Sequence, residues 1–324
     1  MDDALRWVIA GPFMYMAILV FVIRTLYKVL TIVRLPRHLR WDLYPIAHDG
    51  PDGSPYQKAE FWSFTRPYSR VHEVAKMTQE ILLLKRTFMH NRRVWAFSFP
   101  MHSGFYLIGG WLALLLLGAG AELTTGIKIS PASTLFWAKV VNAVTVAAGA
   151  GGLGLGLYGT AGLLWLRLTD ENLKDFTAPV TLVNLYLLLA LFGVGFAAFV
   201  SSDPSFGLAR GYVGSLLLLR PSGGLPLLMV TELLLFGVFL IYLPFSRMLH
   251  FTAKYFFYHA VMWDDEPVKT GSDLEKAIGR YLNYRLEWPA DHITPGGAWF
   301  EQAAANPAQS EREVKQGDET KGQT

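Results

Sequence analysis

Cysteine is absent from this 324-residue chain, and its absence excludes several classes of site. Without thiols the protein has no disulfide, no thiolate zinc centre, no iron–sulfur cluster and no covalently attached c-type haem. Any metal that side chains of this chain bind must therefore be held by histidine or carboxylate. A strong net charge is also lacking, since the formal charge is only +3, which gives no indication of nucleic-acid binding.

Long apolar runs are the main feature that is present. Hydrophobic residues make up 52% of the chain and the mean hydropathy is +0.28, values typical of a multi-pass membrane protein. A membrane-spanning helix needs about 20 apolar residues. Five runs reach that length, at 5–31, 94–119, 135–167, 177–200 and 223–250. The predicted fold class is an all-α integral membrane protein, a five-transmembrane-helix bundle with cytoplasmic amphipathic segments.

Basic residues are concentrated between the first two runs and after the fifth. By the positive-inside rule, the N-terminus is expected outside and the C-terminus in the cytoplasm. The expected organisation is a first transmembrane helix (1–31), a cytoplasmic insert with a surface helix (32–93), a four-helix membrane core (94–255), a cytoplasmic tail with a short helix (256–300) and a disordered polar tail (301–324). The surface helices are predicted at 68–88 and 272–288, the second with Ser272 and Glu275 as a capping box.

Two of the eight histidines stand out by their expected depth. His102 lies eight residues past Val94, about 12 Å along a helix, where an ionisable side chain is expensive and suggests function. His250 ends the fifth run on the same side of the membrane. Facing each other across the bundle, these imidazoles would supply what a bis-histidine haem b requires. Histidines satisfied by hydrogen bonds between helices, or lining a proton or ion pathway, remain alternatives.

Residues near these histidines suggest how a haem would be accommodated. Gly104 follows His102 by two positions and is expected to leave space for a porphyrin edge. Arg247, Arg92 and Arg93 lie near the level at which haem propionates would emerge. His259 is nine residues after His250, which on a continuous helix turns it to nearly the opposite face. The remaining histidines are expected to be solvated or interfacial, with His72 and His90 as reserve ligands: His38, His48, His72, His90 and His292.

Three stretches resemble a known family. "YLPFSRMLHF" (242–251) resembles the fifth-span motif of the cytochrome b (gamma) subunit family of respiratory nitrate reductase, in which the histidine ligates haem. "MHSG" (101–104) is similar to the ligand motif of that family's second span. The glycine-rich run "AAGAGGLGLGLYGTAGLLWLRL" (147–168) is similar to its third span. The resemblance covers about residues 94 to 255 and includes the number and orientation of the spans.

The resemblance breaks at the outer pair of ligands. That family usually carries four histidine ligands and two haems, but the other two positions are Leu112 and Glu232 here. The paired loss implies a single haem b on the cytoplasmic side, held by His102 and His250. Glu232 is expected to be either an interfacial residue or a proton acceptor for a quinol or an outer proton path. A quinone is expected close to the haem, among spans two, three and five.

The long insert and tail resemble relatives in menaquinone-linked complexes, where this cytochrome is paired with a cytoplasmic iron–sulfur subunit like heterodisulfide reductase. The resemblance implies an electron-transfer subunit of a quinone-linked oxidoreductase in a prokaryotic cytoplasmic (inner) membrane. Its partners would be that iron–sulfur subunit, other membrane or redox subunits and the lipid bilayer, and the direction of electron flow is open. The alternative is a haem-free membrane anchor, or a proton- or ion-conducting subunit of a respiratory complex.

Overall fold

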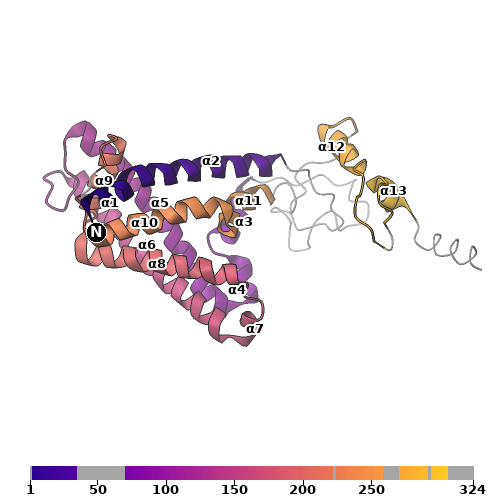
Figure 1. Ribbon diagram of the computed structural model, residues 1–324, viewed down its shortest axis with the longest axis horizontal. Helices are drawn as coiled ribbons and strands as arrows, with labels where there is room; N and C mark the ends of the chain where they lie inside the picture. The colour runs from indigo at the N-terminus through magenta and orange to yellow at the C-terminus, as the bar shows by residue number, and fades with distance from the viewer. Residues whose placement is uncertain (1, 35–69, 222–223, 258–269, 291–292, 306–324) are drawn as a thin grey trace, which may run out of the picture. The chain divides into compact units, whose positions relative to one another are not determined.

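The computed structural model describes residues 2–34, 70–221, 224–257, 270–290 and 293–305 (Figure 1). Within these ranges the regular structure is helical, apart from two isolated β-bridges in the tail. Five helical stretches are long and apolar enough to cross a membrane: Asp3–Val33, Arg92–Thr125, Phe136–Thr169, Pro179–Ser202 and Leu227–Phe245. The predicted all-helical, five-span fold class is confirmed. By helix length and hydropathy, the chain is a multi-pass membrane protein.

The chain divides into two compact units. Residues Met1–Lys28 and Ser69–His250 form the first, and Val29–Tyr68 with Phe251–Thr324 form the second. All of the candidate haem-site residues and Glu232 belong to the first unit. The second unit contains α12 (Asp273–Leu282) and α13 (Trp299–Ala304). Residues 301–304, expected to be disordered, are thus helical, while 306–324 lie outside the described residues.

Helices α5 (Arg92–Thr125) and α6 (Phe136–Thr169) form the closest helix pair of the first unit. Glycines set the distance between them, because a Cβ atom added to Gly104 would lie 2.6 Å from the backbone nitrogen of Gly156. Gly159 lies in the same way against the backbone of Phe97 and Met101. Small residues at a helix contact let two membrane helices approach until their backbones touch. The glycine-rich third span is therefore explained by packing against α5.

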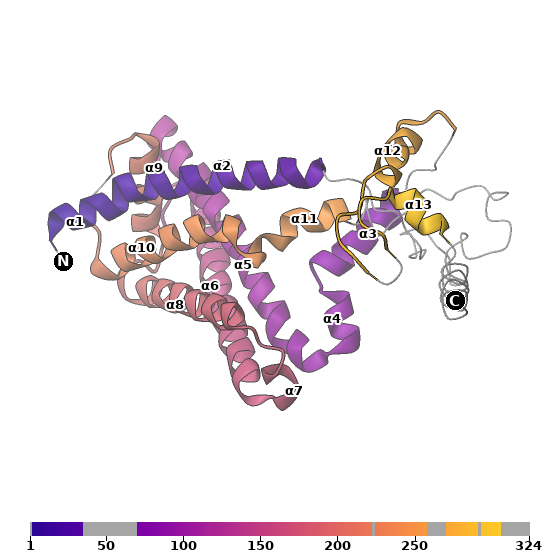
Figure 2. The ribbon, with the colours of Figure 1, turned by 45° about the vertical axis from the view of Figure 1, so that its right-hand side comes forward.

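The first span packs against the later helices of the same unit. It begins as α1 (Asp3–Val8), passes through a π-turn at Ile9–Phe13 and continues as α2 (Met14–Val33). Pro12 lies in that turn and lacks the N–H that a regular helix needs. The ring of Phe13 fills the space beside Gly237 of α10 (Leu227–Tyr242), and Figures 1 and 2 show α2 alongside α10.

The fifth apolar run is broken, which differs from the single span predicted over 223–250. Helix α10 ends at Tyr242, two short 3₁₀ turns follow at Leu243–Phe245 and Arg247–Leu249, and α11 begins at His250 (His250–Phe257). Pro244 cannot donate a backbone hydrogen bond, and the Ser246 hydroxyl accepts from the Met248 amide at 3.1 Å. His250 therefore begins a new helix. Helix α11 is continuous from His250 to Phe257, and His259, predicted to point to the opposite face from His250, lies outside the described residues.

The structure also corrects the shorter helices. The helix predicted at 68–88 is two helices, α3 (Arg70–Ile81) and α4 (Lys85–His90), separated at Leu84, whose φ is 51°. The helix predicted at 272–288 starts as expected, because the Ser272 hydroxyl accepts from the Glu275 amide at 3.2 Å. It ends at Leu282. A further helix, α9 (Gly207–Leu217), occupies the loop expected between the fourth and fifth spans.

We expect Gly104→Ala to destabilise the α5–α6 pair, because the new methyl group meets α6 backbone that has no side-chain freedom with which to adapt. The expected cost is about 1–3 kcal/mol, typical of overpacking. Gly109→Ala on the same helix is the matched control, since a Cβ there has no atom within 4 Å. Thermal unfolding in detergent measures both. Equal melting temperatures for the two variants would show that the glycine contact does not limit the approach of these helices.

Candidate functional site

The structure brings His102 and His250 together. His102 lies on α5 and His250 is the first residue of α11, yet their ring centroids are 6.2 Å apart with the ring planes inclined at 69°. His102 is half-buried and His250 is exposed. Two imidazoles separated by 148 positions along the chain thus lie next to each other in the first unit.

One nitrogen of each imidazole ring is hydrogen-bonded to a backbone carbonyl oxygen. Nδ1 of His102 lies 2.7 Å from the Ser98 carbonyl oxygen, and Nδ1 of His250 lies 3.3 Å from the Arg247 carbonyl oxygen. A carbonyl oxygen only accepts, so Nδ1 carries the proton in both neutral rings and the lone pair is on Nε2. Metal-binding histidines usually have this arrangement, with the second nitrogen donating to a carbonyl that fixes the tautomer and the ring orientation.

The spacing of the rings suits a shared metal. With two metal–nitrogen bonds of about 2 Å, and ~1.1 Å from each nitrogen to its ring centroid, the centroids would be about 6 Å apart. The observed separation of 6.2 Å matches this value, and it is also an ordinary distance for an edge-on contact between two rings. Within the described residues, no group of three or more histidine, cysteine, aspartate or glutamate side chains converges. A two-ligand site favours a metal that brings its own equatorial ligands, as haem does, over a bare zinc ion.

The arginines expected near haem propionates differ in their surroundings. Arg93 donates to the Asp170 carboxylate at 2.9 Å and joins the start of α5 to the end of α6. The Arg92 guanidinium lies 4.8 Å from the Phe88 ring centroid, in a cation–π contact. Arg247 is exposed in the turn directly before His250. Arg247 is therefore the arginine best placed to meet an anionic group beside the histidine pair.

Gly104 has a different role from the one expected. The space beside its Cα is filled by the backbone of Gly152 and Gly156 on α6. It therefore leaves no space for a porphyrin edge and instead serves helix packing. Gly109 and Gly110, further along α5, have no atom within 4 Å of an added Cβ. A glycine that packs and a glycine that leaves space cannot be told apart from the sequence alone.

The positions of the two missing family ligands differ in environment. Leu112 is exposed on α5, at 37% of its full accessible surface. Glu232 on α10 points into the bundle, where one carboxyl oxygen would lie 3.0 Å from a Cβ added to Gly195 of α8 (Pro179–Ser202). Its other oxygen, Oε2, is buried and has no hydrogen-bond partner among the described residues. Glu232 is thus a carboxyl group packed between helices and not a fully solvated one. Burying a carboxylate without a partner costs free energy.

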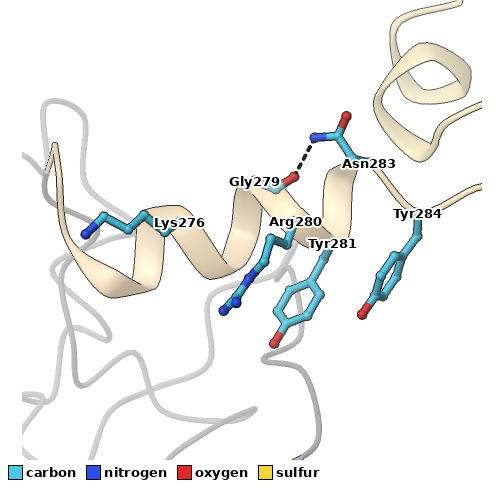
Figure 3. Close-up of a pocket in the computed structure, with 6 residues that line it drawn as sticks. All are labelled: Lys276, Gly279, Arg280, Tyr281, Asn283 and Tyr284. Carbon is cyan, nitrogen blue, oxygen red and sulfur yellow. Dashed lines mark hydrogen bonds between the residues drawn. The ribbon is translucent and has the colours of Figure 1, made fainter.

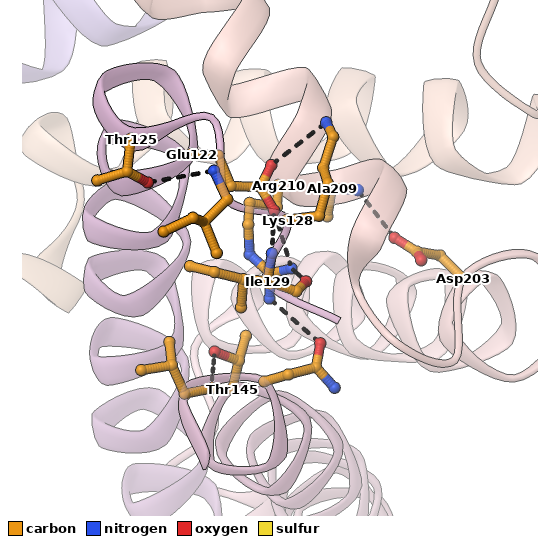
Figure 4. A network of polar contacts seen from close by, with 11 residues as sticks. Glu122, Thr125, Lys128, Ile129, Thr145, Asp203, Ala209 and Arg210 are labelled. Atoms are coloured by element: carbon orange, nitrogen blue, oxygen red, sulfur yellow. Dashed lines mark hydrogen bonds and ion pairs between the residues drawn. The ribbon is translucent and has the colours of Figure 1, made fainter. Parts of the chain in front are cut away.

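A second polar cluster, absent from the sequence-based prediction, surrounds Arg210 of α9 (Figure 4). This side chain is 1% exposed, donates to the Ile129 carbonyl, and has Asn142 at 3.5 Å and Glu122 at 3.8 Å. Burial lowers the pKa of Arg210, while the carboxylates of Glu122 and Asp203 act in the opposite direction. The cluster ties α9 to α5 and α6. The signal for it was a single arginine between apolar residues in "FGLARGYVGSLLLL".

The second unit has a shallow pocket on α12 (Figure 3). Its lining combines two cations with two tyrosine rings: Lys276, Gly279, Arg280, Tyr281, Asn283 and Tyr284. The Asn283 amide donates to the Gly279 carbonyl at 2.7 Å. Among the described residues that line this pocket, there is no carboxylate, no histidine and no hydroxyl other than those of the tyrosines. Its described lining is cationic and aromatic.

No model of a known protein family matches the chain, and no curated protein matches it. The paired histidines are the arrangement in the described residues with the most specific chemistry. They come from separate helices, each has Nδ1 beside a backbone carbonyl oxygen, and their ring separation would allow a shared metal. The function is therefore inferred from this pair.

The His102→Cys, His250→Cys double variant tests the proximity of these positions without any cofactor. No other thiol competes, because the natural chain has no cysteine. We expect a short bifunctional thiol reagent to cross-link the pair readily in membranes, as seen by mass spectrometry of the linked peptides. Leu112→Cys with His250→Cys is the control, because position 112 is about 15 Å further along α5. Equal yields from the two pairs would contradict the observed geometry.

Proposed function

We propose that this protein is a membrane cytochrome b subunit that transfers electrons between menaquinone or menaquinol and a cytoplasmic iron–sulfur partner. A single haem b would be held by His102 and His250. The observation that supports this most strongly is the meeting of two imidazoles from α5 and α11 at 6.2 Å, each with Nδ1 on a backbone carbonyl. The lack of cysteine requires the iron–sulfur clusters to be on another subunit.

Two imidazoles fit a haem b, and the chain would supply these two ligands and the surroundings of the haem. Bound haem would provide one-electron chemistry, while the protein positions it and sets its environment. Carbonyl hydrogen bonds at Nδ1 make each imidazole a stronger donor and fix its orientation. Leu249 is buried directly before His250, and Met101 and Phe105 flank His102 on α5 against the same apolar cluster. An apolar shell of this kind restricts water and influences the redox potential.

We place the quinone near the histidine pair rather than near Glu232. Glu232 lies ten positions, about 15 Å along α10, before that helix ends at Tyr242, and the break separates it further from His250. A quinone beside Glu232 would therefore be far from the histidine pair. The buried, unpartnered oxygen of Glu232 supports a role in proton uptake or release in the other half of the bundle. A quinone analogue should thus perturb the haem spectrum, and an analogue without any effect would count against this placement.

The proposed orientation has the N-terminus outside and the histidine pair near the cytoplasmic face. It follows from the basic residues of the 32–93 segment and of the tail, which the positive-inside rule assigns to the cytoplasm. The partner subunit would bind on these segments. Lys276, Arg280 and Tyr281 on α12, with Tyr284 just after the helix, offer cationic and aromatic contacts for such a partner.

The alternative function is a haem-free anchor or a proton-conducting subunit of a respiratory complex. One observation favours it specifically, namely the buried Glu232 carboxyl oxygen without a hydrogen-bond partner. Intramembrane carboxyl groups often mark proton routes. The two functions differ in haem content, which is directly measurable.

Purified protein is expected to contain one haem b per chain in a pyridine haemochrome assay. His102→Ala and His250→Ala should each reduce that content to near zero, because bis-histidine binding needs both rings. No haem in the wild-type protein would support the haem-free alternative. Two haems per chain would contradict the prediction that a second haem is absent because Leu112 and Glu232 replace its histidine ligands.

The matched control for these variants is His90→Ala, since His90 is an exposed histidine on α4 whose Nδ1 lies 2.8 Å from the Arg86 carbonyl oxygen. It should retain its haem. Full haem retention in His250→Ala would contradict the ligand assignment and would make His90 and His72 the next candidates.

A further inference from the structure

Lys28 of the first span contacts the break in the fifth apolar run. Its Nζ donates to the carbonyl oxygens of Pro244 at 3.2 Å and Ser246 at 3.5 Å. These two carbonyls belong to the segment in which α10 has ended and α11 has not begun. An ammonium group is therefore shared between two backbone oxygens on either side of Phe245.

The broken helix needs such a donor. The last carbonyls of a helix have no intrahelical partner, and the break after Tyr242 leaves further carbonyls outside any helical ladder. Inside a bilayer these oxygens cannot obtain hydrogen bonds from water, so another helix must satisfy them. A cation at the C-terminal end of α10 also meets the negative end of the helix dipole. Lys28 fulfils both requirements.

A second cation of the same helix reaches the same segment. Arg24 lies one turn before Lys28 on α2, and its guanidinium is 4.7 Å from the centroid of the Phe245 ring. Arg24 and Lys28 are four positions apart, so both project from one face of α2. Together they contact three consecutive residues of the break, Pro244 through Ser246.

The shape of the break decides where His250 lies. If α10 continued as a regular helix, His250 would lie about 12 Å beyond Tyr242 along the helix axis. Instead, the extended Ser246, with φ −92° and ψ 168°, redirects the chain, and four residues later His250 faces His102. Lys28 and Arg24 thus contact the segment that sets the position of His250.

We propose that Lys28, assisted by Arg24, is a positioning residue that fixes the break in the fifth apolar run and so places the His250 imidazole opposite His102. The importance of Lys28 for electron transfer rests on the proposed haem function. Its effect on the distance between positions 102 and 250 does not require haem. It assigns a role to the first span, which lies outside the stretch that resembles the cytochrome b family.

The test uses the His102→Cys, His250→Cys chain in membranes, without haem, and compares cross-linking rates. Adding Lys28→Met removes both hydrogen bonds of a charged donor and should slow cross-linking roughly tenfold. Adding Lys28→Arg retains a cationic donor and should restore most of the rate. Lys139→Met is the control, since it removes an exposed lysine of α6.

With the native histidines in place, Lys28→Met should also convert part of the low-spin haem absorption to high-spin, because His250 no longer stays in place. An unchanged cross-linking rate in Lys28→Met overturns the proposal. If that chain fails to accumulate, Arg24→Gln is measured instead, and it must slow cross-linking for the proposal to hold. A wild-type protein without haem would overturn the proposed function while leaving the cross-linking comparison decisive for Lys28.

Discussion

The break between α10 and α11 is the constraint on which the candidate site depends. Pro244 removes a backbone donor and the Ser246 hydroxyl caps the next turn, so the chain bends where an apolar sequence would otherwise continue as one helix. Broken helices occur at membrane depth only where other groups satisfy the exposed backbone. Here the Lys28 ammonium provides hydrogen bonds from the first span. The position of His250 follows from this hydrogen-bonded break.

The partner imidazole is held by a different kind of contact. His102 lies on α5, whose distance from α6 is fixed by Gly104 against Gly156. A backbone contact leaves little freedom for the helix to rotate or slide, because no side chain can adjust. One ring is thus carried by a rigid helix pair, and the other by a turn that a lysine holds. The Arg210 cluster fastens α9 to α5 and α6 and adds to the rigidity of that pair.

The spans were predictable because about 20 apolar residues in a row have one dominant explanation in a bilayer. His102 was singled out because a histidine at membrane depth has few inexpensive explanations, and His250 because it ends the fifth apolar run on the same predicted side. The break was not predicted, since the donor that stabilises it is Lys28, more than 200 positions away in the sequence. Gly104 was misjudged because the same residue type serves close packing and open space. Helix α9 and Arg210 were missed because a short helix between spans has no length signal of its own.

The central proposal is that His102 and His250 would together hold one haem b. Electron paramagnetic resonance of the oxidised, purified protein tests it most directly, because the ferric low-spin signal reports the angle between the two imidazole planes. The 69° inclination predicts a single, strongly anisotropic low-spin signal, which His250→Ala abolishes. The absence of any low-spin haem signal, or a pair of distinct low-spin signals, would contradict the account.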